Sequence, residues 1–387
     1  MTSRIEDAQS VQAKMVHIRR QLHQHPEVGL ELVDTHDYLL GSLRALGFEV
    51  EMHPSAGLTV RVPGFAPDGT TIVLRADMDA LPVTESSDAD FASVREGAMH
   101  ACGHDLHMTM LLGAAEVMTR KPPRRDVVLA FQPGEETDRG ALRTLGHRNL
   151  ATLTGPANAF ALHVHAVLPA HTVNYRSDTF MAFGDWFQVD FHGEGGHASR
   201  PESAGNPIEA ASWFVQDVRS LAEQLSRDEH VVATVTECRM GNTVNVIPAD
   251  GRLRGTIRTL SADRRDRLVD GMRTIAVRSG ERARVTASFQ LHEGYPAVVS
   301  DRSYVSGMVA GLAGTELAPR VQEMAAPSMV IEDFAYFLHR WPGTMVYLGA
   351  QVPGHSAFNH SSEVVFDEDV LATGAALLLL AADGWSL

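Results

Sequence analysis

Four short apolar segments constrain the fold of this chain more than any other feature. They are TIVLRAD (71–77), DVVLAFQ (126–132), AFALHVH (159–165) and TMVYLGA (344–350), and segments of helical spacing separate them. Strands that are apolar along nearly their whole length are buried on both faces, as happens when helices cover both sides of a sheet. The sequence therefore predicts an α/β fold in which a mixed sheet is covered by helices on both faces.

The expected helices follow from apolar residues that recur at three- and four-residue steps. This spacing predicts helices over residues 5–24, 33–46 and 109–118, and another over 368–383. The longest apolar run, 371–382, is too short to span a bilayer, so we expect it to be a buried helix.

The pattern changes between residues 184 and 294, where apolar and polar residues alternate as in half-exposed strands. A helix capped by Asn206 follows the first of these strands. The order strand, helix, two strands, helix, strand predicts a small α+β sandwich. We therefore expect one domain made of residues 1–183 and 295–387, with an inserted domain at 184–294 that serves as a dimerisation or lid domain.

Composition narrows the choice of partners and chemistry. The formal net charge of -15 argues against nucleic acid or an anionic membrane as a partner. Only Lys14 and Lys121 are lysines, and no GxxxxGK[ST] pattern occurs, so Schiff-base and P-loop chemistry are not expected. Cys102 and Cys238 are too few for a disulfide framework, which favours reduced thiols and a cytoplasmic protein. Cys238 lies in an apolar-alternating run and is predicted to be buried. The first residues contain no apolar stretch typical of a secretory signal.

Side chains that can bind metals or transfer protons follow the four apolar segments. Asp79 comes after the first, Glu135 and Glu136 after the second, His163 near the end of the third, and His360 after the fourth. In open α/β sheets, ligands bind at the carboxyl ends of the strands. We therefore expect these side chains to meet at one edge of the sheet.

The segment MHACGHDLH (99–107) adds a cysteine and three histidines to this set. Cys102 and His104 are two positions apart, so in an extended loop they would point to the same side. Thiolate and imidazole together suit zinc, and manganese, cobalt or nickel are alternatives. His100 and His107 are weaker candidates, one of which could hydrogen-bond to a metal ligand. Cys102 acting as a nucleophile is a further alternative.

The two adjacent glutamates can have different roles because neighbouring side chains in an extended chain point in opposite directions. One can ligate a metal while the other takes a proton from water. Asp79 could orient a ligand or simply cap a turn. In the expected insertion, His197 lies in the glycine-rich HGEGGHAS and could donate to an oxyanion, whereas Asn245 and Arg258 could bind a carboxylate.

Taken in order, six motifs resemble those of the M20 metallopeptidase family. The motifs are RADMDALPV, MHACGHDLHMTMLLGAA, FQPGEE, HGEGGHASRP, GNTVNVIPADGRLRGTIRT and MVIEDFAYFL. The nearest resemblance is to the branch of amidohydrolases that includes N-acyl-amino-acid deacylases, hippurate hydrolase and auxin-conjugate hydrolases.

This resemblance implies a zinc-exopeptidase-like catalytic domain that binds two divalent metal ions and hydrolyses N-acyl amino acids. The implied metal ligands are Cys102, His104, Glu136, His163 and His360. The resemblance also implies that Glu135 is the general base and that Asp79 supports the centre. It makes His197 an oxyanion donor supplied across a dimer interface, and it puts Asn245 and Arg258 near the substrate carboxylate.

The expected insertion also has an edge strand that needs covering, so we expect a homodimer or a dimer-based tetramer. A dipeptidase or carboxypeptidase on the same scaffold is the main alternative activity. A non-catalytic protein that binds metal or amino acids is a further alternative, but such a protein would have no use for Glu135 beside a full ligand set.

Overall fold

The computed structural model describes residues 3–137 and 139–385. The chain forms two compact units, which are described separately. Unit 1 spans Met1–Phe180, Val299–Ala325 and Asp333–Leu387, and unit 2 spans Met181–Val298 and Ala326–Glu332. The short segment Ala326–Glu332 thus joins unit 2, although it lies outside the predicted insertion.

Unit 1 is built on a mixed sheet of eight strands in the order β1-β2-β4-β3-β5-β16-β6-β15. The neighbours β4, β3, β5 and β16 are parallel, whereas β1 and β2 are antiparallel. The strands are Val50–His53 (β1), Gly57–Val62 (β2), Thr71–Asp77 (β3), Asp126–Gln132 (β4), Ala157–His165 (β5), Val173–Tyr175 (β6), Val321–Glu323 (β15) and Gly343–Gly349 (β16). The four predicted apolar strands are therefore the four central strands, and their continuous burial explains the apolar runs.

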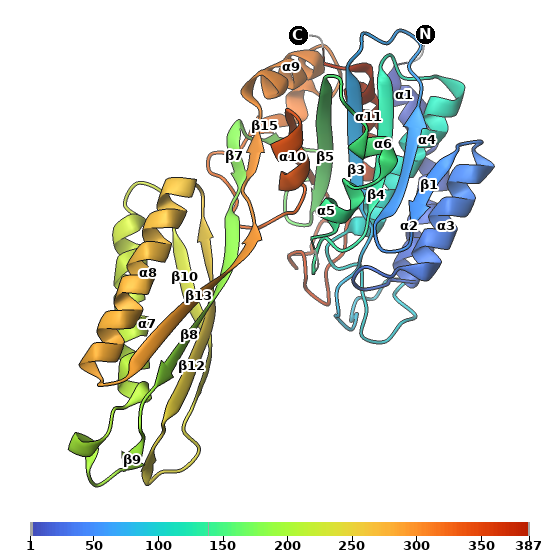
Figure 1. Ribbon diagram of the computed structural model, residues 1–387. Helices are drawn as coiled ribbons and strands as arrows, with labels where there is room; N and C mark the ends of the chain where they lie inside the picture. Colours follow the sequence, from blue (N-terminus) through green and yellow to red (C-terminus); the bar gives the residue numbers. More distant parts are fainter. Residues whose placement is uncertain (1–2, 138, 386–387) are drawn as a thin grey trace. The chain divides into compact units, whose positions relative to one another are not determined.

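Helices lie on both faces of this sheet, as predicted (Figure 1). α4 and α11 pack on one face with α1 and α2 behind them, while α5, α6 and α10 lie on the other. The helices of unit 1 are Arg4–Gln9 (α1), Gln12–Gln24 (α2), Val33–Ala45 (α3), His104–Arg120 (α4), Gly140–Thr144 (α5), Arg148–Ala151 (α6), Arg302–Ala313 (α9), Ala335–Arg340 (α10) and Val370–Asp383 (α11), with a 3₁₀ turn at Ala318–Arg320. Among the described residues, no helix combines the length and hydropathy needed to cross a membrane.

The prediction of one helix over residues 5–24 is wrong in one respect. The segment forms two helices, α1 and α2, with a break at Ser10 and Val11. The Ser10 hydroxyl donates a hydrogen bond to the carbonyl of Asp7 at 2.6 Å, and Val11 leaves the helical conformation at φ -110° and ψ 3°. Serine often competes in this way with the helical backbone pattern.

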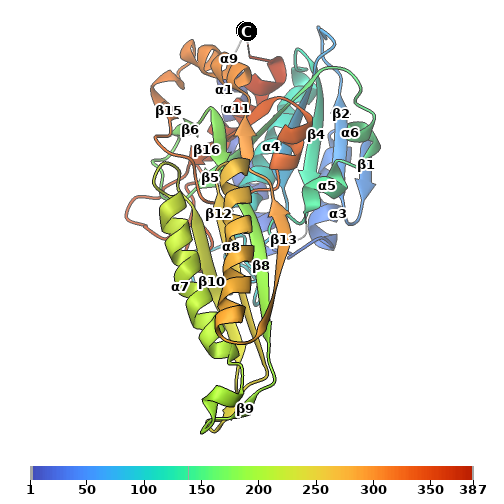
Figure 2. The ribbon, with the colours of Figure 1, turned by 60° about the vertical axis from the view of Figure 1, so that its left-hand side comes forward.

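Unit 2 contains a four-stranded antiparallel sheet in the order β10-β12-β8-β13, with α7 and α8 packed on one face (Figure 2). Its elements are Phe183–His192 (β8), Gly196–His197 (β9), Pro201–Ser203 (a 3₁₀ turn), Pro207–Leu225 (α7), Val232–Met240 (β10), Val246–Ile247 (β11), Asp250–Thr259 (β12), Ala262–Arg282 (α8) and Thr286–Tyr295 (β13). Two further strands, Asp178–Met181 (β7) and Val298–Ser300 (β14), pair with each other. The predicted order of strands and helices in this region is observed, including the Asn206 cap on α7.

Unit 2 has a hydrophobic core of its own. Phe187, Val189 and Phe191 alternate along β8 and are buried against the helices, with the rings of Phe187 and Phe214 centred 6.1 Å apart. The polar residues between them point to the other face of the sheet, which is the alternation that the sequence predicted.

Cys238 is exposed, so the prediction of a buried thiol is wrong. The pairing of β10 with β12 contains a bulge between Val235 and Glu237, beyond which Cys238 lies opposite the core residue Leu253. β10 is nevertheless the edge strand of the sheet and none of its residues is fully buried, so the thiol stays exposed.

Candidate metal centre

The centre lies in unit 1, where the carboxyl ends of parallel strands meet. β4, β3 and β5 are neighbours in the sheet, so the segments that follow them come together at one edge. The five predicted ligands lie in these places: Cys102 and His104 at the start of α4, Glu136 after β4, His163 near the end of β5, and His360 in the loop after β16.

Cys102 is the common member of two groups of donor atoms. Its sulfur lies 3.3 Å from Nε2 of His163 and 3.2 Å from Nε2 of His360. One group joins Cys102 with His104 and His163, the other joins it with Glu136 and His360, and within each group the donor atoms lie within 4.8 Å of one another. A thiolate shared between two sets of imidazole and carboxylate donors fits a pair of divalent cations.

Two of the imidazoles are oriented for metal binding by backbone carbonyls. Nδ1 of His104 lies 2.8 Å from the Asp79 carbonyl, and Nδ1 of His163 lies 2.8 Å from the Val164 carbonyl. Since a carbonyl only accepts, each Nδ1 carries the proton and each Nε2 keeps a lone pair for a cation. Burial lowers the pKa of both rings, which keeps them neutral. Within the described residues, the buried Nε2 of His104 makes no hydrogen bond, as expected of an atom that binds a metal.

Glu136 and His360 complete the second group. Oε1 of Glu136 lies 3.2 Å from Nε2 of His360. Burial alone would raise the pKa of Glu136, but contact with His360 and His104 lowers it overall, so the carboxylate stays ionised. The backbone of His360 is held at φ 74°, which is uncommon for a residue with a side chain, and its N–H donates to the Ala101 carbonyl at 2.8 Å.

The Cys102 thiol is poorly suited to act as a nucleophile. Burial raises its pKa well above the usual range, and the carboxylates of Glu136, Glu135 and Asp77 raise it further. A reactive thiolate needs positive charge nearby, and here that charge would have to come from a bound cation. The environment thus favours a metal ligand over the alternative of a nucleophilic cysteine.

Asp79 holds the turn that carries both glutamates. Its two carboxylate oxygens accept the backbone N–H groups of Glu135 and Glu136 at 2.9 and 3.0 Å. Burial and the charge of Glu136 raise its pKa well above the usual range, although these two hydrogen bonds act in the opposite direction. Because its carbonyl also orients His104, Asp79 supports one ligand and the glutamate turn at once.

Glu135 lies beside the donors without belonging to either group that contains Cys102. A carboxylate oxygen of Glu135 lies within 4.8 Å of the donor atoms of His104 and Glu136. The side chain is almost fully buried, and its Oε1 accepts the backbone N–H of Asp333 at 3.4 Å. This is the arrangement expected for a carboxylate that exchanges protons next to a metal site.

The expected extended loop between Cys102 and His104 is not observed. Gly103 between them adopts φ 89°, and α4 begins directly at His104. A β-carbon at Gly103 would lie 2.3 Å from Cγ2 of Val164. The two donors thus converge through a left-handed glycine packed against β5 rather than through the alternation of an extended chain.

The weaker histidine candidates differ from each other. His107 donates from Nδ1 to Asp77 at 2.6 Å and accepts the Val164 N–H at Nε2 at 2.8 Å, so both of its nitrogens are engaged. It therefore supports the ligand strand instead of binding metal. His100 is buried, neither of its nitrogens has a hydrogen-bond partner in the described chain, and burial lowers its pKa to about 3.

Four buried or partly buried polar residues around the centre were not recognised from the sequence as functional. Asn359 donates to the carbonyls of Cys102 and Val164 at 3.3 and 3.0 Å, which ties two ligand segments together. Arg75, Gln132 and Asp333 form hydrogen bonds with one another below the glutamate turn. An arginine inside the otherwise apolar run TIVLRAD was the one available signal, because arginine is rarely buried without partners.

The remaining three predicted site residues belong to unit 2. His197 on β9 and Asn245, which directly precedes β11, are both exposed, and the Asn245 carbonyl accepts the Ala198 N–H at 3.1 Å. Arg258 lies on β12 and is half-buried, and burial lowers the pKa of its guanidinium. Within the described residues, Arg258 forms no ion pair, although the charge of Asp185, which is paired with Arg265, acts on it.

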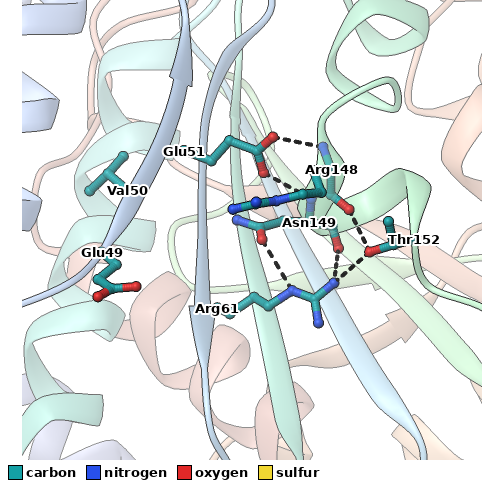
Figure 3. Close-up of a pocket in the computed structure, with 7 residues that line it drawn as sticks. All are labelled: Glu49, Val50, Glu51, Arg61, Arg148, Asn149 and Thr152. Carbon is teal, nitrogen blue, oxygen red and sulfur yellow. Dashed lines mark hydrogen bonds between the residues drawn. The ribbon is translucent and has the colours of Figure 1, made fainter.

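A cavity of unit 1 away from the proposed metal donors is lined by residues of β1, β2 and α6 (Figure 3). Its volume is about 550 Å³. Glu51 accepts the backbone N–H groups of Arg148 and Asn149, and Arg61 donates to Asn149 and Thr152. These polar groups stabilise the local structure by bonding to one another, and we assign no function to this cavity.

A mixed sheet flanked by helices, with thiolate, imidazole and carboxylate side chains clustered at its edge, is typical of hydrolases that use divalent metal ions. Residues 73–383 match the family model described as peptidase family M20/M25/M40, and the chain belongs to that family. It is accordingly a hydrolytic enzyme of the amidohydrolase type.

Individual relatives resemble the chain over almost its full length. An N-acetyldiaminopimelate deacetylase of Oenococcus oeni is 31% identical, covering 93% of this chain and 95% of the relative. Thermostable carboxypeptidase 1 of Saccharolobus solfataricus is 32% identical, with coverages of 95% and 94%. The crystal structure of a dinuclear metal-binding M20 peptidase from Bacillus subtilis superposes with a TM-score of 0.83 at 26% identity, covering 97% of this chain and 98% of that one.

Proposed function

We propose that this enzyme hydrolyses the amide bond of N-acyl amino acids and releases a carboxylic acid and a free amino acid. The observation that carries the proposal is the position of Glu135, a buried carboxylate beside two donor groups that share Cys102. The similarity to an N-acetyldiaminopimelate deacetylase supports this choice of substrate class.

We propose Cys102, His104, Glu136, His163 and His360 as the ligands of two divalent ions. The mixture of sulfur, nitrogen and oxygen donors favours zinc, with manganese, cobalt or nickel as alternatives. Bound cations would polarise the amide carbonyl and acidify the attacking water.

The residues around the donors supply the proton chemistry. Glu135 takes a proton from water and passes it to the leaving amine nitrogen. Asp79 fixes the direction of that carboxylate by binding the backbone N–H of Glu135 itself and of the next residue. Loss of such positioning would lower turnover without removing the base.

In unit 2, His197 is the proposed oxyanion donor. Its Nδ1 accepts the backbone N–H of Ser199 at 3.1 Å, so Nε2 carries the proton and can donate it in a hydrogen bond. Asn245, its neighbour, and the half-buried Arg258 are proposed to bind the substrate carboxylate, for which a guanidinium offers paired donors.

We further propose that the enzyme is a homodimer, or a tetramer built from two dimers, in the cytoplasm. The β9–β11 region that carries His197 is exposed, and Val244 next to it is exposed over its whole side chain. The edge strands β10 and β13 of the unit 2 sheet also offer unpaired backbone groups to a partner. Two free cysteines are compatible with a reducing compartment.

Paired glutamate substitutions test the proposed function. We expect Glu135→Gln to keep both metal ions but to lose hydrolysis of N-acetyl-methionine, because the glutamine side chain cannot take a proton from water. The matched control Glu136→Gln, in the same turn, should lose metal as well as activity. Metal analysis by mass spectrometry and a steady-state assay distinguish the two. Wild-type turnover by the Glu135→Gln variant would refute the assignment of the base.

A carboxypeptidase or dipeptidase activity is the second candidate because the Saccharolobus carboxypeptidase is similarly close in sequence. Hippurate, N-acetyl-methionine and unblocked dipeptides in one assay separate the two activities. A deacylase requires the acyl group, so higher kcat/KM on the dipeptides would favour the peptidase instead.

A further inference from the structure

The buried guanidinium of Arg75 contacts three side chains below the glutamate turn. Arg75 lies on β3 and is 2% exposed. It donates from Nε to Gln132 at 3.0 Å, from Nη1 to Asp77 at 2.5 Å and from Nη2 to Asp333 at 2.9 Å. A planar guanidinium can satisfy three acceptors in fixed directions, which the single ammonium of a lysine cannot do.

The first arm of this network leads to the proposed base. The buried carboxylate of Asp333 accepts from Arg75, from Nε2 of Gln132 at 2.8 Å and from the Ala141 N–H at 2.8 Å. The backbone N–H of the same residue donates to Oε1 of Glu135 at 3.4 Å. The side chain of Asp333 therefore anchors the peptide group that contacts the base.

The second arm leads to a proposed metal ligand. The other carboxylate oxygen of Asp77 accepts from Nδ1 of His107 at 2.6 Å. Because the Val164 N–H donates to Nε2 of His107, Nδ1 must carry the proton and must be the donor to Asp77. The carbonyl of Val164 in turn accepts Nδ1–H of His163, so this arm holds the residue whose carbonyl orients the ligand ring.

We infer that Arg75 is a positioning residue that couples the two halves of the reaction centre, holding Glu135 through Asp333 and His163 through Asp77 and His107. The inference rests on the proposed function, since it treats Glu135 as the base and His163 as a ligand. It assigns separate consequences to the two arms: the Asp333 arm governs turnover, and the His107 arm governs metal affinity.

Three conservative substitutions separate these consequences. Asp333→Asn keeps the size of the side chain, but its amide NH₂ group would face the N–H donors that bind the Asp333 carboxylate. His107→Asn keeps a donor near Asp77 but loses the acceptor for Val164. Arg75→Lys keeps the positive charge but loses the planar arrangement of N–H donors that reaches Gln132, Asp77 and Asp333. The matched control is Arg61→Lys on strand β2 of the same sheet, because the Arg61 guanidinium also bridges two residues, Asn149 and Thr152.

Each variant is assayed for kcat and KM on N-acetyl-methionine at saturating zinc, and separately for zinc affinity by competition with a chelating dye. We expect Asp333→Asn to lower kcat by about tenfold or more with KM and zinc affinity unchanged. His107→Asn should weaken zinc binding by about 10- to 100-fold while kcat at saturating zinc stays close to wild type. Arg75→Lys should show both effects, and Arg61→Lys neither.

An Arg75→Lys enzyme with normal kcat and normal zinc affinity would overturn the inference, as would equal effects of Asp333→Asn and His107→Asn on both quantities. If Arg75→Lys does not fold, the opposite responses of the other two variants still decide the matter. If wild-type enzyme hydrolyses none of the substrates, the proposed function fails. The zinc titrations of His107→Asn and Arg75→Lys then test the metal arm without any activity measurement.

Discussion

At the scale of single residues, Gly103 shows how closely the donors depend on backbone shape. It provides the left-handed conformation between Cys102 and His104, and it packs directly on β5. Both properties exclude a side chain, one through backbone strain and the other through contact with Val164.

A comparison of two glycine substitutions measures this dependence. Gly103→Ala should destabilise the protein by about 2–4 kcal/mol and release metal, because strain in the left-handed region adds to overpacking. Gly97 also has a positive φ, of 77°, but no atom lies within 4 Å of its would-be β-carbon. Gly97→Ala should therefore cost only about 1 kcal/mol and keep its metal. Chemical denaturation and metal analysis of both variants check this, and equal losses would mean that packing on Val164 is unimportant.

The proposed donor residues could be selected from the sequence, and the structure brings them together, but the residues that orient them could not be selected in this way. Cys102, His104 and Glu136 stand out because cysteine, histidine and paired glutamates cluster beside apolar strands. Asp333 could not be linked to Arg75, since the two residues are 258 positions apart and only the folded sheet brings them together.

At the scale of elements, a buried ionic cluster joins α2 to the start of α4. His23 on α2 lies between two carboxylates, 2.8 Å from Asp105 and 3.2 Å from Glu85. Arg19, also on α2, lies 2.8 Å from Asp105, and the ring of His100 is centred 6.4 Å from that of His23. Because Asp105 follows His104 directly, the cluster fixes the end of α4 that carries a proposed ligand.

The pKa shifts in this cluster predict a pH-dependent contribution to stability. Burial and Arg19 lower the pKa of His23, but Asp105 and Glu85 outweigh them and the net shift is upward. Despite its burial, Glu85 has a pKa lowered to about 2, chiefly by its hydrogen bonds with His23 and Ser87. The contribution of His23 to the free energy of unfolding is thus complete below the unfolded-state pKa of about 6.5 and is lost as pH rises through the raised pKa of the folded state. The contribution of Glu85 to the free energy of unfolding is present above pH 4.5 and is lost as pH falls towards 2.

We therefore expect His23→Gln to destabilise the enzyme by about 1–3 kcal/mol near pH 5.5 and by clearly less near pH 9. Urea unfolding of variant and wild type at each pH measures the difference. The matched control is His192→Gln, which removes an exposed histidine 2.7 Å from Asp250 and should change stability little at either pH. A pH-independent effect of His23→Gln would contradict the sign of the His23 shift.

Most elements of the fold could be predicted because their hydrophobic patterns are local. β3 and β4 coincide with the predicted segments, and α7 starts at its predicted cap. The break between α1 and α2 and the bulge in β10 were missed, since one depends on a serine hydroxyl and the other on pairing with β12.

At the scale of the whole molecule, the proposed active-site residues are divided between two units. The metal donors belong to unit 1, whereas His197, Asn245 and Arg258 belong to unit 2. The order of elements along the chain indicated an insertion, but the pattern of one chain does not encode whether the proposed role of His197 is played within its own chain or across a dimer.

Subunit complementation tests whether that histidine acts across a dimer. His197→Ala and Glu135→Gln should each be inactive alone. Their co-expression should restore activity, because in a mixed dimer the Glu135→Gln subunit supplies His197 to the centre of the His197→Ala subunit, which retains Glu135. Co-expression of Glu135→Gln with Glu136→Gln is the matched control, since no mixed dimer then contains an intact centre. No rescue in the first mixture, with mixed dimers verified by mass spectrometry, would mean that His197 serves its own chain.

The sharing of Cys102 by both donor groups has a consequence for the durability of the enzyme. Oxidation of a thiol to a sulfenic or sulfinic acid abolishes its thiolate character. One oxidative event at this sulfur would thus remove a member of both groups, whereas the exposed Cys238 could be oxidised without loss to the centre. If Cys102 is a ligand as proposed, burial and metal binding at this one sulfur atom would be what protects the centre from peroxide.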